Sequence, residues 1–184
     1  MHEMAHQDLA ARIAEVSLLR GEFTLRSGRT SSYYLDKYRF STDPVILRAL
    51  CPRLAARIDL VVRDTGRVHR LGGAELGGIP LVSVASLETG LPGVFVRNAK
   101  KGYGTGRRVE GAIERGDSVV FLEDVATTGG QALEAVGVLE AMGARVPAVV
   151  CVIDREEGAR AAIESKGIAL HALFTKTDLG VTDG

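Results

Sequence analysis

Four short runs rich in β-branched residues recur between residues 68 and 154. They are VHRLGG (68–73), GVFVR (93–97), SVVFLED (118–124) and VPAVVCVID (146–154). None alternates cleanly between apolar and polar residues, which is typical of strands buried on both faces. Segments with helical character separate them, at 77–90 and 129–143. Strands that alternate with helices predict an α/β fold with a mainly parallel sheet flanked by helices.

The first 45 or so residues read differently. Residues 4–20 have the apolar spacing of an amphipathic helix, and residues 22–28 and 31–38 suggest two short strands around a turn. We therefore expect a small, β-containing hood at the N-terminus, over about residues 1–45. The whole chain, 1–184, is of a size for a single domain.

A long helix is predicted to follow the hood. Thr42 or Asp43 can cap its first turn, and Pro44 suits the first helical position. Pro52 lies eight positions further on and is expected to end or kink this helix, because proline lacks the N–H that a helix interior uses.

Charge and hydropathy narrow the classes of function. Lys and Arg total 23, as do Asp and Glu, so bulk charge gives no indication of a nucleic-acid partner. The N-terminal MHEMAHQDLA is polar and carries no apolar signal region, and no stretch reaches the length of a membrane span. We expect a soluble, cytoplasmic protein with no nucleic-acid or membrane partner.

Residues 97–111 interrupt the regular pattern. They hold four glycines, no apolar periodicity and five cations: Arg97, Lys100, Lys101, Arg107 and Arg108. Loops of this length inside compact domains are usually functional or disordered. The segment predicts a mobile cationic loop, and a solvated basic surface turn is the alternative.

The stretch FLEDVATTGG, residues 121–130, carries the most specific chemistry. An apolar run stops at Glu123 and Asp124, at what we expect to be a solvent-facing strand end, where ligands bind in open α/β sheets. Backbone N–H groups of residues 127–131, at the start of a helix, form a ready anion site. The carboxylates suit sugar hydroxyls or a bridging magnesium ion. A plain strand–turn–helix connection is the alternative.

These residues also resemble a known family. The two hydrophobic residues, two acids and Thr/Gly turn of 121–130 resemble the phosphoribosyl pyrophosphate (PRPP) motif of type I phosphoribosyltransferases. Residues 23–38, 95–111 and 152–159 are similar to the substrate segment, mobile loop and base-binding turn of the orotate phosphoribosyltransferase family. Residues 75–92 fit the same family, so the resemblance extends from about Phe23 to about Gly158.

The resemblance implies the type I phosphoribosyltransferase fold and transfer of phosphoribose from PRPP to orotate, with Mg²⁺ and without a named protein ligand for the metal. It implies a homodimer whose loop is shared between subunits. Lys101 and Asp124 would be catalytic, while Thr127, Arg155 and Tyr34 would bind orotate. The PRPP-binding residues would be Arg26, Arg97, Lys101, Tyr103, Glu123, Asp124, Val125, Ala126, Thr127, Thr128, Gly129, Gly130 and Gln131.

Some positions depart from the family pattern. Asn98 stands where many relatives have a second cation, and Leu35 replaces an aromatic found in some. Leu76 and Gly77 fall where some relatives have a Tyr-Lys pair, so this loop can offer only backbone donors to pyrophosphate.

Two other functions stay open. A phosphoribosyltransferase for a purine or another base would keep the phosphate loop, although it has no reason for Arg155 beside a substrate carboxylate. A non-catalytic PRPP-sensing regulator is the second, and the full cationic loop and the neutral overall charge argue against it.

Overall fold

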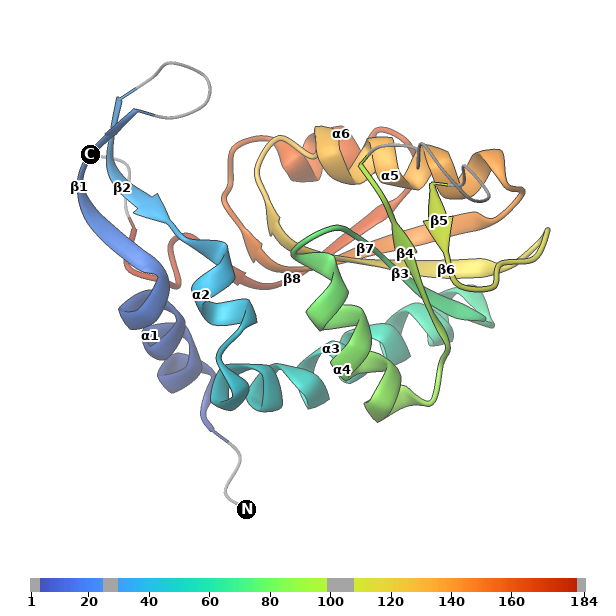
Figure 1. Ribbon diagram of the computed structural model, residues 1–184, viewed down its shortest axis with the longest axis horizontal. Helices are drawn as coiled ribbons and strands as arrows, with labels where there is room; N and C mark the ends of the chain where they lie inside the picture. Colours follow the sequence, from blue (N-terminus) through green and yellow to red (C-terminus); the bar gives the residue numbers. More distant parts are fainter. Residues whose placement is uncertain (1–3, 25–29, 99–107, 182–184) are drawn as a thin grey trace.

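A six-stranded sheet forms the centre of the protein (Figure 1). The computed structural model describes residues 4–24, 30–98 and 108–181. The strand order is β5-β4-β3-β6-β7-β8, and every neighbouring pair is parallel except β4 with β5. This confirms the predicted α/β fold with a mainly parallel sheet. The strands are β3 (Arg70–Ala74), β4 (Gly93–Val96), β5 (Val109–Glu110), β6 (Ser118–Ala126), β7 (Arg145–Asp154) and β8 (Ala169–Thr175).

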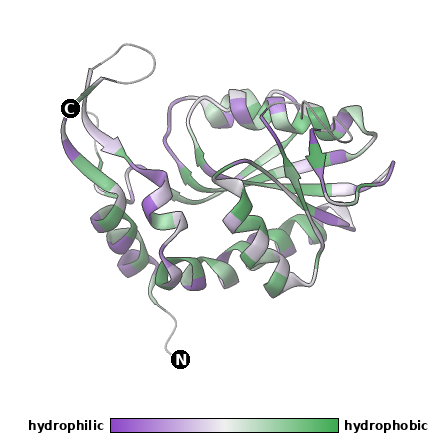
Figure 2. Cartoon of the chain, viewed as in Figure 1, coloured by the Kyte–Doolittle hydropathy of each residue, from purple (hydrophilic) through white to green (hydrophobic). Residues whose placement is uncertain are grey.

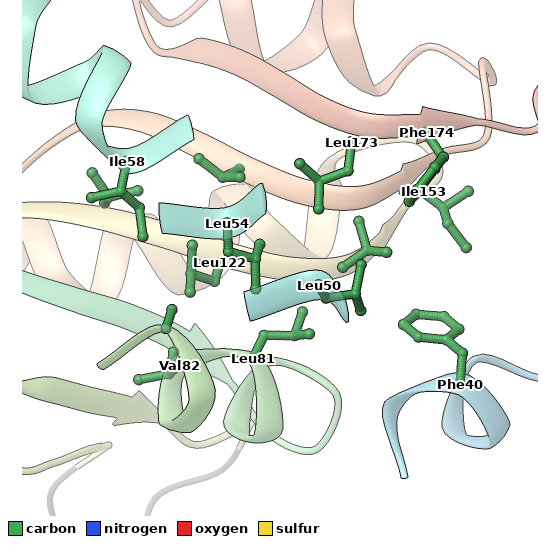
Figure 3. Close-up of a cluster of buried hydrophobic side chains, with 14 of the residues drawn as sticks. Phe40, Leu50, Leu54, Ile58, Leu81, Val82, Leu122, Ile153, Leu173 and Phe174 are labelled. Carbon is green, nitrogen blue, oxygen red and sulfur yellow. The ribbon is translucent and has the colours of Figure 1, made fainter. Parts of the chain in front are cut away.

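Helices cover both faces of this sheet. In Figure 1, α3 (Pro44–Thr65) and α4 (Gly78–Thr89) lie on one side, and α5 (Gly130–Ala141) and α6 (Ala159–Glu164) on the other. Figure 2 shows the strands of the sheet as mainly hydrophobic, as expected between two helical layers. Successive side chains of β6 enter different cores: Leu122 packs with α3 and α4, whereas Phe121 packs with α5. Figure 3 shows Leu122 beside Leu54 and Leu81.

Helix α3 does not end at Pro52, which is one of the two predicted outcomes, and it continues through the proline to Thr65. One face of the helix is buried along its whole length, and this packing outweighs the loss of one helical hydrogen bond. The buried residues are Ile46, Leu50, Leu54, Ile58 and Val61. The predicted start is confirmed, since Asp43 caps the helix by accepting from the N–H groups of Val45 and Ile46.

The N-terminal segment forms the predicted hairpin with different limits. Helix α1 (His6–Ser17) ends three residues early, because residues 18–20 begin strand β1 (Leu18–Thr24) and pair with β2 (Thr30–Leu35). The second predicted strand is likewise too long: after Leu35 the chain forms a short helix, α2 (Lys37–Ser41).

Helix α2 is anchored on the large sheet. The ring of Phe40 is fully buried and, in Figure 3, lies toward Ile153 and Phe174 of β7 and β8. In Figure 1, α2 lies between the β1–β2 hairpin and the large sheet. This anchor fixes the side chains at the start of α2 with respect to the ends of the central strands.

The predicted long loop is shorter than 97–111. Residues 109 and 110 form β5, which pairs with Phe95 and Val96 of β4. Residues 99–107, which include Lys101 and Tyr103, lie outside the described part of the chain, as does Arg26. In residues 4–24, 30–98 and 108–181, no helix combines the length and the apolar character needed to span a membrane.

Candidate active site

A pocket of about 90 Å³ opens where β6 ends and α5 begins. It lies at the carboxyl end of a central strand, where ligands bind in this class of sheet. The predicted phosphate loop forms its walls. The lining residues are Glu123, Val125, Ala126, Thr127, Thr128, Gly129, Gly130, Gln131 and Ala132.

The turn into α5 depends on Gly129. Its φ is +81°, a conformation that suits glycine, and an added Cβ would lie 3.2 Å from Ile163 and 3.3 Å from the Ala159 carbonyl oxygen. The turn therefore leads directly into a 12-residue helix. The backbone N–H groups in the first turn of this helix have no partner within the helix. These donors and the helix dipole make the pocket suited to a phosphate.

The acid pair is buried, which contradicts the expectation of a solvent-facing strand end. Asp124 is fully buried and Glu123 is 7% exposed. Asp124 Oδ1 accepts from the Val125 N–H at 2.7 Å and from the Lys37 ammonium at 3.1 Å. The cause is that α2 and the residues around Gly77 cover the end of β6.

The surroundings of Glu123 and Lys37 alter their pKa values. Burial first, and then the negative charge of Asp124, raises the pKa of Glu123 to about 8. Burial alone would lower the pKa of Lys37, but the charges of Asp124 and Glu123 outweigh it and raise that pKa. The Oε2 atom of Glu123 is buried and has no hydrogen-bond partner within the described residues. An incoming group that brings positive charge or hydroxyl donors would satisfy this oxygen.

Gly77 closes over Asp124. A Cβ at position 77 would lie 1.6 Å from Asp124 Oδ2, so any side chain there collides with the carboxylate. At the positions where some relatives have a Tyr-Lys pair, this chain has Leu76 and Gly77, and Gly77 packs directly on Asp124.

Replacing Gly77 with alanine is expected to lower kcat/KM by about 100-fold, because Asp124 must shift to admit the methyl group. The φ of Gly77 is −72°, so the clash and not the backbone causes the effect. Gly137→Ala on α5 is the matched control: no atom lies within 4 Å of its added Cβ, and stability should rise by about 0.5–1 kcal/mol. Wild-type kinetics for Gly77→Ala would show that the packing of Gly77 on Asp124 does not affect catalysis.

The end of β7 meets the end of β6. The Arg155 N–H donates to the Ala126 carbonyl at 2.9 Å, and the Ala159 N–H donates to the Thr127 carbonyl at 3.1 Å. These bonds place the base-binding turn of residues 152–159 directly beside the phosphate loop. The predicted members of the two sites, Thr127 and Arg155, are thereby brought together.

The Arg155 guanidinium is held from two sides. It donates to the Tyr33 hydroxyl at 3.0 Å and pairs with Glu157 at 2.8 Å, and its central carbon lies 5.4 Å from the Tyr33 ring centroid. A guanidinium fixed in this way can bind a carboxylate with two parallel hydrogen bonds.

Tyr33, and not Tyr34, contacts Arg155. Tyr34 is 46% exposed, and its ring packs 5.7 Å from that of Phe23. Neighbours on a strand point to opposite sides, so the two tyrosines cannot share this role. Sequence reasoning missed Tyr33 and Lys37, whose partners lie 122 and 87 positions away. No local pattern distinguishes them.

The base of the cationic loop is fixed by hydrogen bonds. The Arg97 N–H donates to the Arg108 carbonyl at 2.7 Å. Asn98 donates its backbone N–H to Glu75 Oε1 at 2.8 Å, and Arg108 donates to the Asn98 carbonyl at 3.2 Å and to Glu134 at 2.8 Å. The Asn98 side-chain amide also donates to the Glu75 carbonyl at 3.3 Å, so the residue that stands where many relatives have a second cation ties the loop base to the residues beside Gly77.

A sheet of this order, with an acid pair and a Thr/Gly phosphate loop at the end of β6, defines a phosphoribosyltransferase of the type I fold. Two solved structures agree. The orotate phosphoribosyltransferase from Aeropyrum pernix superposes with a TM-score of 0.79 at 33% identity, covering 94% of this chain and 96% of that one. The Mycobacterium tuberculosis H37Rv enzyme in complex with PRPP gives 0.77 at 29% identity, covering 96% and 99%.

Sequence comparison specifies the member of this class. No protein-family model matches the chain. The orotate phosphoribosyltransferase of Haloquadratum walsbyi is 44% identical over 178 residues, which are 96% of this chain and 93% of that protein. The chain belongs to the orotate phosphoribosyltransferase family, pentosyltransferases that make orotidine 5′-monophosphate and pyrophosphate from orotate and PRPP in pyrimidine biosynthesis. The predicted family, activity and fold are confirmed, and the purine-base and regulator alternatives are set aside.

Proposed function

We propose that the two joined strand ends divide the substrates between them. The loop from Thr127 to Gln131 holds the 5′-phosphate of PRPP, and Glu123 and Asp124 hold the ribose hydroxyls. Arg155, with Thr127, binds the orotate carboxylate. The observation that carries this assignment is the pair of backbone bonds that join the end of β6 to the turn at Arg155. PRPP bound to the similar M. tuberculosis enzyme supports it.

The remaining assignments follow the family resemblance. Arg26, Arg97, Lys101 and Tyr103 bind the phosphates of PRPP, with Lys101 nearest the departing pyrophosphate. The resemblance gives Tyr34 the place near the base, but Tyr34 points to the opposite side of β2 from Tyr33, so we assign that place to Tyr33, which contacts Arg155. The chain forms a single domain over residues 1–184 and acts in the cytoplasm.

The chemistry consists mainly of placing charge. As pyrophosphate leaves, positive charge develops on the ribose and negative charge on the leaving group. Asp124 stabilises the first, together with Glu123 where Glu123 is ionised, and the cationic loop stabilises the second. Because Asp124 is fully buried, its interaction with a ribose cation is weakly screened by water.

Magnesium is assigned to the substrate more than to the protein. In the described residues, no group of three or more His, Cys, Asp or Glu side chains could hold a metal ion. Mg²⁺ keeps several waters and commonly binds substrate phosphates, so it reaches this site bound to PRPP. When bound, it neutralises part of the pyrophosphate charge.

A base panel tests the assignment of substrates. The protein is incubated with PRPP, Mg²⁺ and one of orotate, uracil, adenine or hypoxanthine, and pyrophosphate release is followed. Release is expected with orotate and Mg²⁺, and its loss on chelation should be reversed by added Mg²⁺. Faster release with a purine would contradict a site built around Arg155.

We further propose a homodimer in which the loop of one subunit serves the site of its partner. The loop base at Arg97 and Arg108 is anchored beside Glu75, next to the residues that cover Asp124, which supports a role for the loop at a site of this kind.

Subunit mixing tests this arrangement. Lys101→Ala and Asp124→Asn homodimers are each expected to be nearly inactive. A mixed dimer would have one doubly altered site and one intact site, so exchange should restore up to about a quarter of wild-type activity. Absence of recovery despite proven subunit exchange would mean that the loop closes over its own chain's site.

A further inference from the structure

Lys37 contacts the acid pair and has no part in the proposed binding of either substrate. It is the first residue of α2, and its ammonium lies 3.1 Å from each carboxylate oxygen of Asp124. The fold holds it there: Phe40 of the same helix is fully buried against the sheet, and the Asp36 N–H just before the helix donates to the Ser17 carbonyl at 2.9 Å. The contact is thus built into the packing of α2.

Two elements contribute the charged and aromatic groups around Lys37. Asp124 and Glu123 face it from β6, and on α2 the Tyr38 ring centroid lies 5.6 Å from the ammonium. Asp124 is fully buried, whereas the Lys37 side chain is 30% exposed. A fully buried carboxylate is costly without a cationic partner, so Lys37 stabilises Asp124 where it stands.

We propose that Lys37 is a positioning residue for the transferase reaction, which holds the Asp124 carboxylate oriented toward the ribose of PRPP. This inference rests on the proposed assignment of Asp124 to that ribose. Lys37 acts through Asp124, so its removal should impair the use of PRPP and leave the binding of orotate at Arg155 nearly unchanged.

The test compares Lys37→Met, Lys37→Arg, Asp124→Asn and the Lys37→Met/Asp124→Asn double variant, with kcat and both KM values measured. Lys37→Met is expected to lower kcat/KM for PRPP by about 100-fold, with KM for orotate changed by less than about 3-fold. Lys37→Arg keeps the charge and should recover part of this loss. Lys166→Met, which removes an exposed lysine, is the control and should match wild type.

A pH profile separates positioning from a general structural role. The charge of Lys37 lowers the pKa of Glu123, so its removal should raise that pKa further above about 8. Glu123 would then stay protonated to higher pH. The acidic limb of kcat/KM for PRPP should move to higher pH in Lys37→Met and stay in place in Lys166→Met.

The double variant distinguishes the possible failures. In the Asp124→Asn background, Lys37→Met should cost less than about 3-fold, because the carboxylate it positions is gone. Losses that multiply, or wild-type kinetics for Lys37→Met, would overturn the inference alone. Wild-type activity of Asp124→Asn would instead overturn the assignment of Asp124. If Lys37→Met does not fold, Lys37→Gln replaces it in the test, and wild-type kinetics and pH profile in Lys37→Gln would overturn the inference.

Discussion

Asp124→Asn is expected to lower kcat by about 30- to 1000-fold, which corresponds to about 2–4 kcal/mol of transition-state stabilisation. Asparagine has nearly the same size and can still accept from the Val125 N–H, so the shape of the site is kept. What is lost is a fully buried negative charge, at the place where the ribose becomes positive under the proposed assignment. Steady-state kinetics with PRPP and orotate, at saturating concentrations of both, measure the effect.

Stability must be separated from catalysis in this variant, because Asp124 also pairs with Lys37. Asp117→Asn is a matched control. Asp117 is a buried acid at the other end of β6, paired with Arg70 and bonded to the Glu114 N–H at 2.8 Å. Both variants should unfold at lower temperature, yet only Asp124→Asn should lose kcat. Equal losses of kcat in the two variants would mean that weakened packing, and not the missing charge, explains the result.

Sequence reasoning was most successful where the signal is local. The buried strands, the Asp43 cap and the phosphate loop from Thr127 to Gln131 each depend on residues within a few positions of one another. It did not decide between an end and a kink at Pro52, where burial of one helix face carries the helix through the proline. The predicted first helix is also too long. Leu18 and Leu19 suit a helix as well as a strand, and in the structure they belong to β1, which pairs with β2.

The site was predicted in part for the same reason. Its walls come from one continuous segment, so the motif in 121–130 identified them. Lys37 and Tyr33 come from the N-terminal hood. They contact Asp124 of β6 and Arg155 after β7 through tertiary packing, which no local pattern predicts. The burial of Asp124 has the same origin, since α2 and Gly77 cover it.

Arg155→Ala is expected to raise KM for orotate far more than KM for PRPP. The guanidinium is assigned to the orotate carboxylate, and the loss of a charge-assisted hydrogen bond costs about 1.5–3 kcal/mol, or about 10- to 150-fold. Tyr33→Phe, which removes one partner of Arg155 and keeps the ring, should produce a smaller change of the same kind. A collapse of PRPP binding with orotate binding intact would place Arg155 on the wrong substrate.

In the proposed division of the substrates, Arg155 recognises the carboxylate of the base, beside a ribose-phosphate site at the end of β6. The direct test is kcat/KM for orotate and for uracil, which has the same ring without the carboxylate, in the wild type and in Arg155→Ala. We expect the wild type to prefer orotate strongly and the variant to lose about 10- to 150-fold of this preference, through the orotate value alone. If the ratio of kcat/KM for orotate to kcat/KM for uracil is the same in Arg155→Ala as in the wild type, Arg155 does not recognise the carboxylate.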